Sequence, residues 1–138
     1  MSVVKSKRSE GQLSVIVKAN KLASYTIHVC SNEKHFPKHY RWCVTSKIVE
    51  AALDINNNIT MANAVFVIDK NDFDLRKKFQ TKAIAASYAL LSMMDIAYNA
   101  FGIDSTTMEY WTGLVLEVQN YLRNWKKSDA ERYKEITG

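Results

Sequence analysis

The stretch from Pro37 to Asn63 constrains the fold most, because it holds no glycine and no second proline. Proline suits the first turn of a helix, where its missing N–H would have no intrahelical partner. Apolar residues then recur in steps of three and four, as on one face of an α-helix: Tyr40, Val44, Ile48, Ala51, Ile55, Ile59, Ala62 and Phe66. The pattern predicts one helix, roughly 45 Å long at 1.5 Å per residue.

Three other stretches show helical periodicity and provide partners for this long helix. The first predicted helix spans residues 13–31, and the short link at 32–36 predicts that the next helix runs back antiparallel. A third helix is expected over residues 73–101, with Asn71 or Asp72 as N-cap and Gly102 just past its C-terminus. Four helices in this order predict an all-α, up-down-up-down antiparallel four-helix bundle.

The expected fourth helix begins near Thr106, which has capping-box spacing to Glu109, with Ser105 as the competing cap. It continues through Trp125, and Ser128-Asp129 is expected to cap one further short turn. The predicted organisation is a flexible basic arm at residues 1–12, the bundle at 13–128 and a polar tail at 129–138.

Composition excludes several other classes of protein. Four glycines and one proline in 138 residues leave little material for the turns of an all-β fold. No run approaches eighteen apolar residues and the N-terminus lacks a signal-peptide core, so a cytoplasmic protein with no membrane contact is expected. Cys30 and Cys43 are expected to be reduced core residues.

Basic side chains predict an anionic partner. Nineteen Lys and Arg against fourteen Asp and Glu give a net charge of +5, which favours nucleic acid only mildly. Antiparallel helices would gather most of these cations at one end of the bundle, although solvated lysines near helix ends are also ordinary. The candidate RNA- or DNA-binding residues are Lys38, Arg41, Arg76, Lys77, Lys78, Lys82, Arg123, Lys126, Lys127 and Arg132.

No residue pattern predicts catalysis or a cofactor. His35 and His39 have a spacing that can hold a metal on a helix, but Pro37 lies between them and no third ligand is obvious. The chain has no glycine-rich phosphate loop, nucleophile elbow or paired-carboxylate motif. Trp42 lies off the apolar stripe, which makes it a candidate for a subunit interface. We therefore expect a non-enzymatic protein without metal.

Several short motifs, in order, resemble a group of small bacterial four-helix-bundle proteins. This group includes the accessory variability determinant (Avd-like) proteins of diversity-generating retroelements and is related to bundle proteins encoded in ribosomal RNA intervening sequences. The resemblance covers about residues 13–132. Its motifs are Leu22-Ala23-x-Tyr25-Thr26, Asn32-Glu33-Lys34-x-Phe36-Pro37-Lys38-x-x-Arg41, Ala62-Asn63, Leu90-Leu91, Trp125 and Lys127-Ser128-Asp129-x-x-Arg132.

The resemblance implies a more specific role than the residues alone. Such proteins form pentameric barrels, bind nucleic acid through basic surfaces and associate with a reverse transcriptase during mutagenic cDNA synthesis from a template RNA. The alternative hypothesis is a homo-oligomeric scaffold that contacts other proteins and binds no nucleic acid.

Overall fold

The computed structural model describes residues 7–137, with side chains for residue 12 and residues 14–137. Its four long helices are α1 (Lys7–Cys30), α2 (Ser46–Ala64), α3 (Lys70–Phe101) and α4 (Ser105–Arg132), followed by the short α5 (Lys134–Thr137). No strand occurs in these residues, which confirms the prediction of an all-α fold.

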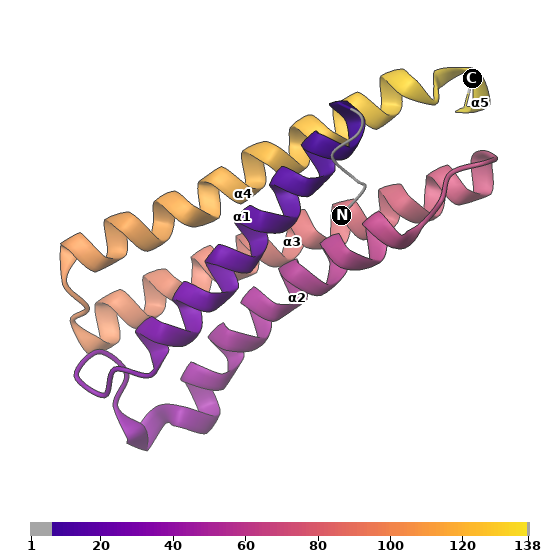
Figure 1. The fold of residues 1–138 in the computed structure, drawn as a ribbon. Coiled ribbons are helices and arrows are strands. Elements are labelled where there is room, and N and C mark those ends of the chain that lie inside the picture. The colour runs from indigo at the N-terminus through magenta and orange to yellow at the C-terminus, as the bar shows by residue number, and fades with distance from the viewer. Residues whose placement is uncertain (1–6, 138) are drawn as a thin grey trace.

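The long helices lie along one elongated axis (Figure 1). α1 packs against α2 and α4, and α3 packs against the same two helices. One end of the molecule, which we call the His35 end, carries the link between α1 and α2 and the start of α4. The opposite end, called the Asp69 end, carries the link between α2 and α3 and the end of α4.

The core is formed by the predicted apolar stripes. In α2, Ile48, Ile55 and Ile59 are fully buried, as the spacing predicts. Trp111 of α4 is also fully buried, and its indole Nε1–H donates to the Thr26 hydroxyl of α1 over 2.9 Å. The indole nitrogen is the only polar atom of this large buried ring, and the bond provides its hydrogen-bond partner.

The predicted continuous helix from Pro37 is wrong in its first turns. Pro37 has an extended ψ of 135°, a 3-10 turn spans Lys38–Tyr40, and a π-helical turn spans Arg41–Thr45 before α2 begins at Ser46. Phe36 explains the interruption, because its ring is buried against Phe101 and Trp111 and draws the chain inward just before the proline. The wider π turn then resets the helical register.

That change of register leaves predicted core residues at the surface. Tyr40 is 43% exposed, although its ring contacts Phe101. Trp42, which was expected to lie off the apolar stripe, is 82% exposed. Cys43 is exposed as well, against the expectation that both cysteines are core residues, and both are free thiols.

Both predicted N-caps are displaced toward the N-terminus. Asp69, rather than Asn71 or Asp72, caps α3 by accepting from the Asp72 N–H, and Asp72 completes a capping box. Asp104, rather than Thr106 or Ser105, caps α4 by accepting from the Thr107 N–H. In both helices the aspartate carboxylate accepts the N–H of the third residue after it, as an N-cap side chain does.

The end of α3 follows the prediction, because Gly102 adopts the left-handed conformation with φ 67° and ψ 40°. A residue with a side chain would be strained there.

The outer boundaries of the bundle also differ from prediction. α1 already begins at Lys7, inside the predicted arm, whereas residues 1–6 lie outside the described residues. α4 continues through Asp129, which is 1% exposed, so Ser128-Asp129 does not cap a new turn. Most of the predicted polar tail is therefore helical, in α4 and α5.

Candidate nucleic-acid interface

Arg76, one of the predicted contact residues, is buried. Its Nη1 donates to both carboxylate oxygens of Asp129 at 3.3 Å, and its Nη2 donates to the Val65 carbonyl at 2.7 Å. Gln80 donates to the same carboxylate at 3.0 Å, and the Trp125 ring lies 5.8 Å from the guanidinium carbon. The expectation that Arg76 lies on the surface is wrong, because its guanidinium forms an ion pair with the buried Asp129 carboxylate.

Arg132 belongs partly to the same network. Its Nη1 lies 3.9 Å from Asp129 Oδ1, and its guanidinium lies 5.9 Å from the centre of the Tyr133 ring. The side chain is 29% exposed, so one face remains in contact with solvent. We leave Arg132 and Arg76 out of the candidate interface.

A group of cations gathers where α4 faces α3. Arg123 donates to the Tyr88 hydroxyl of α3, and its guanidinium carbon lies 5.5 Å from the centre of that ring. Lys126 and Lys127 follow at the third and fourth positions, on the same side of α4. Lys77 precedes Tyr88 by three helical turns, which places it on the same side of α3. We call Lys77, Arg123, Lys126 and Lys127 the seam cations.

The seam cations form no ion pair within the part of the chain that the structure describes. No carboxylate of the described residues lies within 4.0 Å of them, since the carboxylates nearby in the sequence have other partners. Asp74 pairs with Lys70 at 3.0 Å, and Glu131 pairs with Lys134 at 3.5 Å. Lys126 is half-buried, whereas the other three seam cations are exposed.

The other predicted cations form two separate groups. Lys78 and Lys82 lie one turn apart on α3 and are exposed, on a side adjacent to that of Lys77. Lys38 and Arg41 are exposed beside the start of α2 at the His35 end, whereas the seam cations lie on α3 and α4 (Figure 1). The structure thus brings together four of the ten predicted residues.

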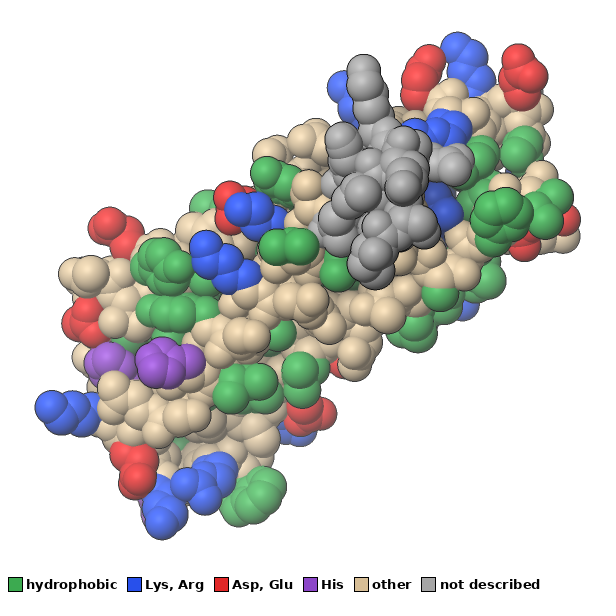
Figure 2. Space-filling view, viewed as in Figure 1, with side chains coloured by type: hydrophobic (Ala, Val, Ile, Leu, Met, Phe, Trp, Pro, Cys, Tyr) green, Lys and Arg blue, Asp and Glu red, His purple; other side chains and the backbone are tan. Residues whose placement is uncertain are grey.

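The face formed by α1 has a mixed charge (Figure 2). Acidic and basic side chains are interspersed on it, and Lys18 of α1 pairs with Glu117 of α4 at 3.3 Å. Histidine side chains gather at the His35 end. The contrast with the unpaired seam cations makes the α3–α4 side the better candidate for phosphate contact.

Sequence reasoning missed Tyr88 as a member of this site. The residue is 52% exposed and supports Arg123 from another helix, 35 positions away. The spacing of Lys77 and Tyr88, three helical turns apart, indicates that they share one side of α3. The sequence does not show which turn of α4 lies opposite Tyr88, so the contact with Arg123 could not be predicted.

Comparisons with known proteins give no relative. No protein-family model matches the chain, and neither a curated protein nor a solved structure matches it. Among the described residues, no helix is long and apolar enough to cross a bilayer. Over the same part of the chain, no three His, Cys, Asp or Glu residues gather as a metal-binding group.

Proposed function

We propose that this protein binds RNA or DNA without catalysing a reaction, through phosphate contacts of the seam cations. The observation that carries the proposal is the position of Lys77, Arg123, Lys126 and Lys127 on two adjacent helices, with no carboxylate partner among the described residues. Unpaired cations at a surface attract the phosphate backbone and release its counterions. The proposed contacts are to phosphates and involve no base edge, so affinity rests on the nucleic-acid backbone.

Tyr88 adds an aromatic surface to the same site. Its ring is 52% exposed and its hydroxyl accepts a hydrogen bond from Arg123, which fixes both side chains. An unpaired base can stack on such a ring with little dependence on its identity. Single-stranded nucleic acid therefore suits the seam better than a duplex does.

We further propose the assembly and the cellular role that the family resemblance implies. We infer that the four long helices form an up-down-up-down antiparallel bundle, which the pairwise packing of α1, α2, α3 and α4 supports. The proposed role is an accessory protein of a reverse transcriptase in a diversity-generating retroelement, acting as a cytoplasmic homopentamer during mutagenic cDNA synthesis.

Exposed apolar side chains favour a second candidate, a homo-oligomeric scaffold without nucleic-acid binding. Trp42 at the His35 end is 82% exposed, whereas Phe66 and Ile68 at the Asp69 end are 76% and 70% exposed. Contiguous exposed apolar surface marks sites where other proteins bind, and Phe66 and Ile68 lie two positions apart in the link between α2 and α3. They account for self-assembly but do not explain the unpaired seam cations.

The test compares two double variants with the same change in net charge. Arg123→Glu/Lys127→Glu removes two seam cations, and Lys21→Glu/Lys47→Glu changes exposed lysines of α1 and α2. Fluorescence anisotropy with a labelled single-stranded RNA at low salt measures affinity. We expect the seam variant to bind about tenfold more weakly or worse, and the control variant to lose much less.

Light scattering on the same samples measures the oligomer. A seam variant that remains assembled but no longer binds RNA supports the nucleic-acid role. Equal RNA binding by both variants, or no binding by the unmodified protein, favours the scaffold instead. A mass other than that of five chains contradicts the pentamer alone.

A further inference from the structure

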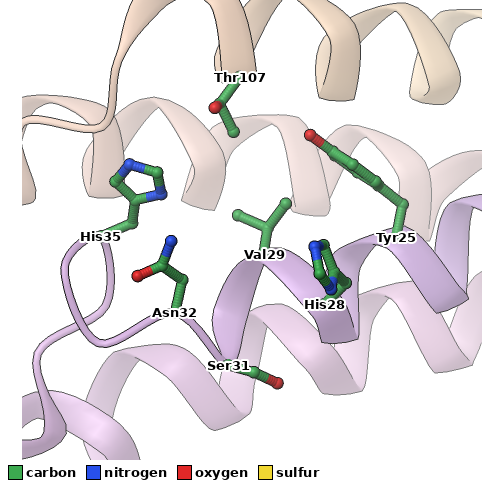
Figure 3. A pocket seen from close by; sticks show the side chains of 7 residues that line it. All are labelled: Tyr25, His28, Val29, Ser31, Asn32, His35 and Thr107. Carbon is green, nitrogen blue, oxygen red and sulfur yellow. The ribbon is translucent and has the colours of Figure 1, made fainter.

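A cavity of about 360 Å³ lies between the end of α1, the following link and the start of α4 (Figure 3). Its wall is formed by Tyr25, His28, Val29, Ser31, Asn32, His35 and Thr107. It lies at the His35 end and includes none of the seam cations.

Two side chains that line the cavity, Asn32 and His35, are held in place by contacts with residues that do not line it. Asn32 Oδ1 accepts the Lys34 N–H at 3.0 Å, which fixes the amide and turns its Nδ2 donor toward the cavity. His35 Nε2 lies 3.2 Å from Asp104 Oδ1, and Asp104 is itself held by the hydroxyl and N–H of Thr107. The second nitrogen of the His35 ring is left without a partner among the described residues.

Tyr25 and His28 form the opposite wall. The Tyr25 ring packs edge-on against Tyr110 at 4.8 Å between centroids, and the His28 ring lies 6.3 Å from it. Burial, with help from Tyr110 and Asp104, raises the pKa of Tyr25, so its hydroxyl stays protonated and can donate. That hydroxyl points into the space that the Asn32 amide and the His35 ring also face.

The side chains that line the cavity indicate which class of ligand it can bind. No Lys, Arg, Asp or Glu is among the residues that line the cavity, so its wall offers no fixed charge to an ionic ligand. The wall offers an amide donor, a hydroxyl and aromatic rings instead. These groups suit an uncharged, flat ring that carries hydrogen-bond acceptors, as a nucleobase does.

We propose that this cavity binds one unstacked nucleobase, with the Asn32 amide and the Tyr25 hydroxyl donating to its edge. Lys34, Lys38 and Arg41 are exposed close in the sequence to Asn32 and His35, so we expect them to contact the adjoining phosphates. The inference rests on the proposed function, because it assigns the His35 end a base contact that complements the phosphate contacts of the seam.

The test uses a nucleoside, which has no phosphate and therefore does not depend on the seam cations. 2-Aminopurine riboside is titrated with the full chain, and its fluorescence reports stacking. Asn32→Ala and Tyr25→Phe each remove one donor, and each is expected to weaken binding about 2- to 12-fold. Asn58→Ala is the matched control, because the Asn58 amide donates to the Asp54 carbonyl on α2 and is not part of the cavity wall.

The outcomes separate this inference from the proposed function. Nucleoside binding that weakens in Asn32→Ala and Tyr25→Phe but not in Asn58→Ala supports the base site. No nucleoside binding, equal binding by all four proteins, or displacement of the nucleoside by inorganic phosphate overturns it. RNA anisotropy on the same proteins reports the seam independently, so a lost base site with intact RNA binding leaves the proposed function standing.

Discussion

Arg76 and Asp129 are 53 positions apart in the sequence and form an ion pair with side chains only 6% and 2% exposed. The pair joins the first turns of α3 to the last turns of α4, and Arg76 also reaches the Val65 carbonyl at the end of α2. Three helices are therefore tied together at the Asp69 end by one guanidinium.

Removing either partner of this pair is expected to destabilise the fold strongly. Asp129→Ala leaves a buried guanidinium without its carboxylate, so the free energy of unfolding should fall by about 3–5 kcal/mol. Urea denaturation measures the loss. Asp74→Ala breaks the exposed pair with Lys70 and serves as control, with an expected loss of about 0–1 kcal/mol. The double variant Arg76→Met/Asp129→Leu should lose less than Asp129→Ala, and an equal loss would contradict this explanation.

The displaced cap of α3 can be tested directly. Asp69→Ala should lower the free energy of unfolding by about 0.5–2 kcal/mol, because the Asp72 N–H loses its acceptor. Asn71→Ala, at the cap position favoured by the sequence, should change it by less than about 0.5 kcal/mol. A larger effect at Asn71 than at Asp69 would refute the capping box.

The bond between Trp111 and Thr26 should contribute to stability across the core. Thr26→Val keeps the shape but removes the acceptor of a fully buried indole N–H, which costs about 1–3 kcal/mol. Thr60→Val is the control, since the Thr60 hydroxyl is exposed and donates only to the Asn56 carbonyl. Similar unfolding midpoints for the two variants would argue against this role.

The two cysteines should differ in reactivity toward a thiol reagent. Burial raises the pKa of Cys30 to about 12, so at pH 8 only about one molecule in ten thousand carries its thiolate. Cys43 is exposed and should react first. We expect one fast equivalent in the native protein and the second only after unfolding in urea. Two equally fast equivalents would show that Cys30 is accessible.

The same pKa predicts a loss of stability in alkali. The unfolded thiol ionises near its ordinary value of 9.0, whereas the folded thiol holds its proton to about 12. The folded state therefore binds more protons between these values. The contribution of Cys30 is fully present below pH 9 and is lost as the pH rises toward 12. Cys30→Ala should reduce the slope of stability against pH in this range, and an unchanged slope would contradict the assignment.

Helical periodicity predicted the all-α fold and the stripe of Ile48, Ile55 and Ile59, because one buried face per helix determines such spacing. It did not predict the 3-10 and π turns before α2, because these depend on the burial of Phe36 between residues distant in the sequence. A local sequence pattern gives no information about contacts between residues that are far apart in the chain.

The candidate site likewise combines features that the local sequence pattern predicts with features that depend on contacts between helices. The spacing of Arg123, Lys126 and Lys127 was visible in the sequence, and the structure shows Arg123 in contact with Tyr88 of α3. The burial of Arg76 was not visible, because it depends on where α4 crosses α3. The cavity beside Asn32 and His35 likewise requires Thr107 from a different helix.

The most direct test of the central claim is the salt dependence of RNA affinity, measured by anisotropy for the unmodified chain and for Arg123→Glu/Lys127→Glu. Three or four phosphate contacts predict a slope of log affinity against log salt of about −2 to −3, and losing two contacts should reduce its magnitude by about 1.4. The account predicts this reduction together with weaker binding. An unchanged slope in the variant would show that the seam between α3 and α4 is not the phosphate-binding surface.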